Sequence, residues 1–127
     1  IDCFGMMRGG EIFVPKLPSY RIVDVAKAIC PDCTQKIVGI RPGEKLHEEM
    51  ITETDSLNTI EHEKFYVLLP STSAELNVES LRSEYLARGG KPCEEGFRYS
   101  SGENTDFLSM EEISKLIAEN MIGQGCD

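Results

Sequence analysis

The stretches EIFVPK at residues 11–16 and KIVGI at residues 36–40 decide the fold class. Each is short, apolar and rich in residues that favour β-strands. Between them, apolar side chains recur at helical spacing over residues 21–29, and Ser19 stands where it can cap that helix. Two strands joined by a helix of this length predict a βαβ-like unit with a parallel strand pair, and therefore an α/β fold.

The remainder of the chain adds shorter elements to this unit. Apolar runs and turn residues alternate along it, which is the usual signature of strands and helices separated by loops. In chain order we expect a turn at residues 41–44, a helix over 44–50, a polar loop at 54–58, a hairpin from 59–63 and 65–69, a polar connection at 71–77, a helix over 79–88 and an extended piece at 97–100.

The clearest local signal is a capping box at residues 109–112, which read SMEE. The Ser109 hydroxyl can accept a hydrogen bond from the Glu112 N–H, and the Glu112 carboxylate can reach back to the N–H of Ser109. An apolar stripe at helical spacing follows, and Gly123 is placed to end it. The pattern predicts a C-terminal helix.

Length and charge limit the functions open to the chain. Its 127 residues suit a single domain spanning residues 1–127, and its 13 basic and 22 acidic residues give a net charge of −9. Such a surface repels phosphate backbones, so we expect no nucleic-acid partner. No apolar run approaches the roughly 20 residues of a membrane span, so we expect no membrane partner either.

The chain starts at Ile1, without an initiator methionine, and it shows no signal-peptide pattern. We therefore expect a fragment or a processed chain, located in the cytoplasm. The five cysteines are an odd number, which does not indicate a disulfide framework. Free thiols in a reducing cytosol are the simplest expectation.

Cys30 and Cys33 form a Cys-x-x-Cys pair that requires separate consideration. The pair follows the end of a predicted helix, where the helix dipole has the wrong sign to activate a thiol. A structural zinc site needs two further ligands at suitable spacing, and the sequence offers none. We therefore expect a helix-to-strand loop that carries two cysteines and no metal, with zinc or redox chemistry as weaker alternatives.

The common catalytic and cofactor signatures are missing. The sequence contains no G-x-G-x-x-G turn, no Walker Gly-Lys-Ser/Thr and no Tyr-x-x-x-Lys pair. We accordingly assign no catalytic residue and no bound cofactor to this chain.

The turn RPGEKLHE at residues 41–48 gathers charged groups directly after the second predicted strand. Ligands of α/β sheets bind near the carboxyl ends of strands. Arg41 offers a planar fork of donors suited to a phosphate, and Glu44 can accept from hydroxyl or amide donors. A solvated turn with an Arg–Glu surface pair is an equally good interpretation on physical grounds alone.

The blocks GGEIFVPKLPS at residues 9–19 and IVGIRPGEKLHE at residues 37–48 closely resemble the C-terminal part of bacterial UDP-N-acetylglucosamine 4,6-dehydratases (inverting). These enzymes are polysaccharide biosynthesis proteins of the extended short-chain dehydrogenase/reductase superfamily and act at the start of pseudaminic acid synthesis. Residues 99–101 and the acidic-start helix also fit the family's tail. The related UDP-sugar epimerases and retaining dehydratases are the nearest alternatives.

The resemblance implies a small substrate-binding C-terminal domain, with a short parallel strand pair, helices, a hairpin and a C-terminal helix. It implies that Arg41 contacts the UDP moiety and that Glu44 contacts a nearby hydroxyl or amide, with Lys16 as a weaker substrate contact. In the family, NADP and the catalytic residues belong to an N-terminal Rossmann domain that this sequence lacks. The implied lyase is a homo-oligomer in nucleotide-sugar and surface-polysaccharide biosynthesis.

Two hypotheses therefore follow from the sequence. The first is the UDP-sugar-binding C-terminal domain of a nucleotide-sugar dehydratase, which is not catalytic alone. The second is a free-standing interaction or oligomerisation module, whose apolar faces pack on another protein or on a second copy.

Overall fold

The chain divides into two units in the structure, a computed structural model that describes residues 2–71 and 77–121. The first unit contains residues 1–16 and 48–103, and the second contains residues 17–47 and 104–127. The expectation of one domain over residues 1–127 stays a prediction. The strands are β1 Ile12–Pro15, β2 Glu49–Ile51, β3 Thr59–Glu61, β4 Phe65–Leu68, β5 Lys91–Pro92 and β6 Tyr99–Ser100. The helices are α1 Ile22–Ile29, α2 Val78–Ala87 and α3 Met110–Met121, with short 3-10 helices η1 Asp2–Gly5 and η2 Glu53–Asn58.

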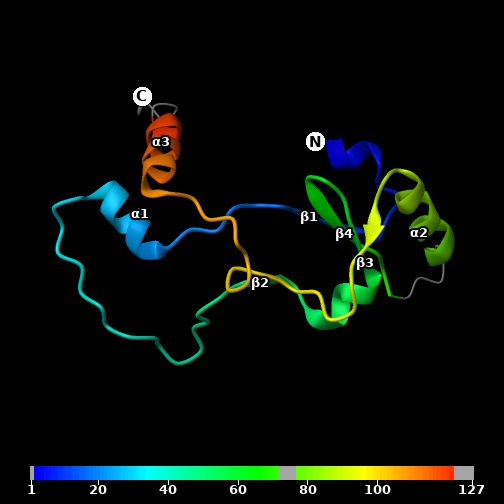
Figure 1. Ribbon diagram of the computed structural model, residues 1–127, viewed down its shortest axis with the longest axis horizontal. Helices are drawn as coiled ribbons and strands as arrows, with labels where there is room; N and C mark the ends of the chain where they lie inside the picture. The colour runs from blue at the N-terminus through cyan, green and yellow to red at the C-terminus, as the bar shows by residue number, and fades with distance from the viewer. Residues whose placement is uncertain (1, 72–76, 122–127) are drawn as a thin grey trace. The chain divides into compact units, whose positions relative to one another are not determined.

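The first unit is built on a four-stranded antiparallel sheet with the strand order β1-β4-β3-β5 (Figure 1). Strands β3 and β4 form the predicted hairpin, with Ile60 opposite Val67. Strand β1 is also confirmed as a strand, and Val14 lies opposite Tyr66 of β4.

The continuous apolar run of β4 is explained by burial on both faces of the sheet. Successive side chains of a strand point to opposite faces. Val67 packs with Leu81 and Tyr85 of α2 on one face. Tyr66 packs with Val14 and Ile51 on the other. A strand covered on both sides reads as apolar throughout rather than as an alternating pattern.

The predicted helix over residues 44–50 is wrong. Its last residues belong to β2, which pairs antiparallel with β6, and Ile51 lies opposite Tyr99. The Ile51 side chain is fully buried, so a contact distant in sequence decides the local conformation. The predicted polar loop at residues 54–58 is the 3-10 helix η2, which starts with a capping box between Thr52 and Asp55.

Helix α2 confirms the prediction for residues 79–88. Asn77 caps its start, because the side-chain oxygen accepts a hydrogen bond from the Ser80 N–H at 3.1 Å. Leu81 and Tyr85, four residues apart on one face, are both buried against the sheet. Most of the predicted polar connection at residues 71–77 lies outside the described residues.

The second unit contains α1 and α3, which pack against each other (Figure 1). Both were predicted. The capping box of α3 is present: the Ser109 N–H donates to Glu112 Oε2 at 2.8 Å, and the Glu112 N–H donates to Ser109 Oγ at 3.3 Å. The expected helix end at Gly123 lies outside the described residues.

Residues 36–40 do not form a strand, so the predicted parallel strand pair is wrong. Gly39 has a φ of +82°, which interrupts an extended conformation, and the segment runs along α1 without pairing to a sheet edge. Every strand pair within the described ranges is antiparallel. A parallel pairing occurs at an isolated bridge between Ser19 and Phe107.

Ser19 does not cap α1, contrary to prediction. Arg21 occupies the N-cap position and makes no side-chain cap hydrogen bond. Ser19 instead joins two distant segments: its N–H donates to the Asp106 carbonyl at 2.8 Å, and its carbonyl accepts from the Leu108 N–H at 2.8 Å.

The mixed α/β class is confirmed. Within residues 2–71 and 77–121, no helix has the length and apolar character that a bilayer span requires.

Candidate functional site

A groove in the second unit lies between α1 and the loop that follows it. Its volume is about 740 Å³. One wall is formed by the first half of α1, from Ile22 to Ala26, and the other by residues 35–40 and 44–46. The amphipathic character of α1 explains this wall, because its apolar side chains repeat at helical spacing.

The groove is unusually apolar for an exposed surface. Ile37, Val38 and Leu46 are 89%, 74% and 81% exposed. Ile22 of the α1 wall is 74% exposed. These exposed apolar side chains are available to contact a ligand or another protein.

The turn between the two loop segments of the groove holds Arg41 and Glu44 together. The Arg41 N–H donates to Glu44 Oε2 at 2.8 Å, and the Glu44 N–H donates to the Arg41 carbonyl at 3.0 Å. Gly43 has a φ of +86°, a left-handed conformation that glycine adopts without strain. The turn is therefore closed by its own backbone and by the Glu44 carboxylate.

The Arg41 side chain remains accessible within this turn. Its Nε lies 3.7 Å from Glu44 Oε1, and the side chain is 79% exposed. An exposed, loosely paired guanidinium retains donors that can reach the oxygens of a phosphate. Such a pair contributes little to stability, so its position next to the groove is the more informative property.

The charges around the groove are mainly positive, although the chain as a whole is acidic. Lys36 and Lys45 line the groove together with Glu44. Arg41 lies in the adjoining turn and is not among the lining residues. The net charge of the whole chain is −9. A local excess of cations is what an anionic ligand needs to approach an acidic protein.

Lys16 belongs to the first unit, and its charge is already engaged there. Its Nζ lies 2.6 Å from Glu61 Oε1 and 4.9 Å from the centre of the Tyr66 ring. The structure therefore brings Arg41 and Glu44 together. Lys16 makes a separate contact within the first unit.

A buried polar cluster around Glu11 and Tyr85 was not predicted from the sequence. Glu11 is 6% exposed, and its carboxylate accepts from the N–H groups of Arg8 at 2.8 Å and Gly9 at 2.6 Å and from Tyr85 Oη at 3.0 Å. Burial acts to raise the pKa of Glu11, but these hydrogen bonds outweigh it and the pKa lies below its ordinary value. Burial followed by the Glu11 hydrogen bond raises the pKa of Tyr85. The glycine turn before Glu11 was the one sequence feature that could have indicated this cluster, because the backbone N–H groups of a turn need a hydrogen-bond acceptor.

Two further groups of the first unit resemble reactive residues by type, but their surroundings argue against chemistry. His62 stacks on Phe65 with ring centres 4.8 Å apart, and its Nε2 is buried without a hydrogen-bond partner. Burial lowers the pKa of His62, so the ring is neutral near pH 7. Burial also raises the pKa of the Cys93 thiol to about 11, which makes it a poor nucleophile.

Cys30 and Cys33 are joined by a disulfide, which corrects the expectation of free thiols. Their Cα atoms are 5.4 Å apart across the turn that ends α1, within the usual range for a bridge. Cys3 and Cys93 are free, and Cys126 lies outside the described residues. Across the described part of the chain, no three His, Cys, Asp or Glu residues are placed to hold a metal ion.

The fold is similar to part of a known larger structure. The X-ray structure of Pen from Bacillus thuringiensis superimposes with a TM-score of 0.67 at 21% identity, covering 95% of this chain and 35% of that one. The architecture is thus a mixed α/β arrangement similar to part of that structure. The model of the family described as polysaccharide biosynthesis protein matches residues 1–70. The chain belongs to the polysaccharide biosynthesis protein family.

Curated relatives agree with the resemblance stated from the sequence. The chain is 42% identical over 114 residues to the UDP-N-acetylglucosamine 4,6-dehydratase (inverting) of Campylobacter jejuni subsp. jejuni serotype O:2, covering 90% of this chain and 34% of the relative. It is 31% identical over 114 residues to the UDP-glucose 4-epimerase of Rickettsia akari, covering 87% of this chain and 32% of that relative. The chain therefore spans about a third of the length of these relatives.

Proposed function

We propose that this chain is the UDP-sugar-binding part of a UDP-N-acetylglucosamine 4,6-dehydratase and that it binds its ligand in the groove of the second unit. The groove beside the Arg41–Glu44 turn is the observation that carries the proposal. The 42% identity to a curated dehydratase supports this substrate class.

The chemistry of the groove suits the nucleotide portion of a nucleotide sugar. The Arg41 guanidinium would donate to diphosphate oxygens, with Lys36 and Lys45 adding local positive charge. Glu44 would accept from a ribose hydroxyl or from an amide N–H. The apolar side chains along α1 and residues 37–40 would cover the faces of the base.

Lys16 is a weaker candidate for a substrate contact. Its ammonium group already interacts with Glu61 and the Tyr66 ring, so a ligand would have to replace those contacts. We therefore expect substitution of Lys16 to affect nucleotide affinity less than substitution of Arg41.

The residues of this chain do not fit NADP. A dinucleotide needs a glycine-rich turn between a strand and a helix N-terminus. The described helices α1, α2 and α3 begin after Arg21, Asn77 and Ser109, and none of them follows such a turn.

In our proposal the cofactor and the catalytic residues belong to a Rossmann domain outside these residues. The complete protein is a cytoplasmic, homo-oligomeric lyase of surface-polysaccharide or pseudaminic acid synthesis. The chain alone should give no 4-keto-6-deoxy product when supplied with NADP.

The test is a titration of the ¹⁵N-labelled chain with UDP-N-acetylglucosamine, UDP and UMP. The proposal predicts saturable shifts in residues 35–46, with UMP weaker than UDP because it lacks the second phosphate. Absence of saturable binding, or shifts confined to the first unit, would reject the proposal.

Two alternatives are distinguished by simple additions to this test. The similarity to UDP-glucose 4-epimerases supports an epimerase part as the second candidate, and a preference for UDP-glucose over UDP-N-acetylglucosamine would favour it. The exposed apolar groove supports an interaction or oligomerisation module. A concentration-dependent dimer in sedimentation, combined with no nucleotide binding, would favour that module.

A further inference from the structure

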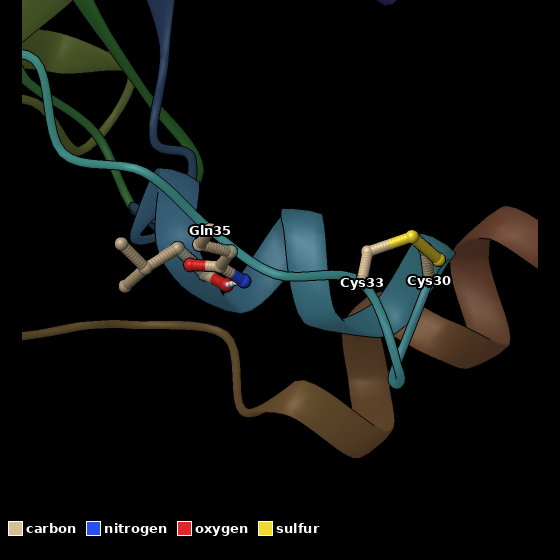
Figure 2. The surroundings of a disulfide bond; sticks show 4 residues. Cys30, Cys33 and Gln35 are labelled. Carbon is tan, nitrogen blue, oxygen red and sulfur yellow. Dashed lines mark hydrogen bonds between the residues drawn. A yellow bond between two sulfur atoms is a disulfide. The ribbon is translucent and has the colours of Figure 1, made fainter.

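The Cys30–Cys33 disulfide lies where α1 ends and the groove loop begins. Cys30 is the C-cap of α1, and its N–H still donates to the Ala26 carbonyl at 3.0 Å. The Cys33 N–H donates to the Cys30 carbonyl at 3.2 Å, which closes the turn. Figure 2 shows the disulfide at the end of the helix and the chain running back from it beside the helix. The bond therefore links the end of α1 to the start of the loop, across a turn that backbone hydrogen bonds also close.

The loop beyond the disulfide is attached to α1 again at Gln35. The Gln35 Nε2 donates to the Val23 carbonyl at 3.3 Å (Figure 2). Val23 is in the first turn of α1, so the loop passes back along the helix between these two attachments. The segment from residue 35 to residue 40 that forms the groove wall contains no helix or strand of its own. A segment without internal hydrogen-bonded structure depends on its attachments for its position.

We propose that Cys30 and Cys33 are a redox-sensitive pair whose disulfide holds the groove wall in its binding conformation, so that reduction weakens nucleotide binding. The inference rests on the proposed function of the groove, because it assigns regulation to that site. A cross-link acts chiefly by restricting the conformations available to the open chain. Here the restricted chain is the start of the groove wall, and a looser wall must be ordered again when a ligand binds.

The pair is accessible to exchange with small thiols. Cys33 is exposed and Cys30 is half-buried, so Cys33 is the sulfur that an external reagent meets. With oxidised glutathione, the Cys33 thiolate attacks one sulfur of the glutathione disulfide and expels one glutathione thiolate. The Cys30 thiolate then attacks Cys33 Sγ, forms the Cys30–Cys33 bond and expels the second glutathione. Two electrons and the two cysteine protons end on the two reduced glutathione molecules.

The position at a helix C-terminus argues against a thiol catalyst. The negative end of the helix dipole disfavours a thiolate, and Asp32 adds a carboxylate between the two cysteines. Cysteines whose thiolate form is disfavoured exchange slowly but still reach equilibrium with their surroundings.

The experiment uses the chain with Cys3→Ser, Cys93→Ala and Cys126→Ser, so that Cys30 and Cys33 are the remaining cysteines. The protein is equilibrated in glutathione buffers of graded ratio, and alkylated thiols are counted by mass spectrometry. UDP affinity and the backbone ¹⁵N order parameters of residues 34–40 are measured in the fully oxidised and fully reduced states. A further Cys30→Ser/Cys33→Ser variant serves as a control, which should behave as the reduced protein in every buffer.

We expect both thiols to titrate together, and reduction to lower UDP affinity about threefold or more and to lower the order parameters of residues 34–40. Equal affinity and equal order parameters in the two states would overturn the inference and leave the proposed function intact. A disulfide that resists reduction by a large excess of glutathione would overturn it as well. Failure of UDP to bind in either state would reject the proposed function, and the inference with it.

Discussion

Glu44 accepts a hydrogen bond at 2.8 Å from the backbone N–H of Arg41, and its other carboxylate oxygen lies 3.7 Å from the Nε of the same arginine. The carboxylate therefore closes the turn through the backbone and leaves the guanidinium loosely paired. This relationship explains how an exposed turn can be ordered and still present donors to a ligand. It also gives Arg41 and Glu44 different roles in the proposed site, with Arg41 as the phosphate donor.

The first prediction concerns Gly43, whose φ is +86°. Gly43→Ala should weaken UDP binding about fivefold, because holding an alanine in the left-handed conformation costs roughly 1 kcal/mol. A Cβ there would meet no atom within 4 Å, so the effect is conformational rather than steric. Isothermal titration calorimetry measures the change.

Gly89→Ala is the matched control for that prediction. Gly89 has a φ of +89° and equally open space, but it belongs to the first unit. The control should lower stability and leave UDP affinity unchanged. Equal losses of affinity in both variants would show that Gly43 has no specific part in the site.

The second prediction tests the close packing of the first unit at Gly90. A Cβ there would lie 2.5 Å from Ile60 Cγ2 and 2.9 Å from the Tyr85 carbonyl oxygen, which belongs to the backbone and cannot rotate away. Gly90→Ala should lower the free energy of unfolding by about 2–3 kcal/mol in urea denaturation. Gly5→Ala, which introduces a Cβ into open space, should change it little. Similar values for the two variants would contradict the packing described.

The third prediction concerns the hydrogen bond from Tyr85 Oη to Glu11 at 3.0 Å. Tyr85 is 1% exposed, so Tyr85→Phe removes a buried hydroxyl that donates to a carboxylate. We expect a loss of about 1.5 kcal/mol in the free energy of unfolding. The exposed Tyr20 provides the control, since Tyr20→Phe should have no measurable effect. A neutral Tyr85→Phe variant would mean that the cluster does not stabilise the fold.

These elements also show which features a sequence reveals and which it hides. The hairpin, α2 and the capped helix α3 were predictable because their signals are local: apolar runs bounded by turn residues, helical spacing and a capping box. Residues 36–40 were mistaken for a strand because β-branched residues favour strands only where a neighbouring strand is available. Residues 49 and 50 were mistaken for part of a helix because the partner of their strand, β6, is about fifty residues away.

The candidate site divides in the same way. Arg41 and Glu44 were identifiable because both are in one turn marked by Pro42 and Gly43. The contact between Glu11 and Tyr85 joins residues that are 74 positions apart, and no local sequence pattern indicates it. The Cys30–Cys33 spacing is compatible with a loop, a metal site or a disulfide, so only the structure of the turn distinguishes them.

The fourth prediction is a pH dependence due to His62. Burial, followed by the positive charges of Arg88 and Lys16, lowers its pKa in the folded state below the ordinary 6.5. The unfolded chain therefore takes up the proton first, and stability should fall as the pH drops from 6.5 toward 5, by at most about 1.4 kcal/mol per pH unit. His62→Phe should flatten this part of the profile, measured by urea unfolding at each pH.

Two comparisons make the His62 prediction specific. His47→Phe, at an exposed position of the second unit, should keep the wild-type profile between pH 5 and 6.5. The lowered pKa of Glu11 affects stability in a different pH range. Its contribution to the free energy of unfolding is present above pH 4.5 and is lost as the pH falls further. If the His62→Phe variant kept the wild-type dependence of stability on pH, the lowered pKa of His62 in the folded state would be contradicted.

The most direct test of the central claim is the UDP affinity of Arg41→Ala compared with Arg98→Ala. Arg98 is the matched control because it is also exposed and pairs with a carboxylate, that of Glu103, in the first unit. Both substitutions change the net charge equally, so they separate a specific phosphate contact from the general field. The account predicts about a tenfold or larger loss of affinity for Arg41→Ala, an unchanged unfolding midpoint, and little effect of Arg98→Ala. Equal UDP affinities for Arg41→Ala and the unsubstituted chain would contradict it.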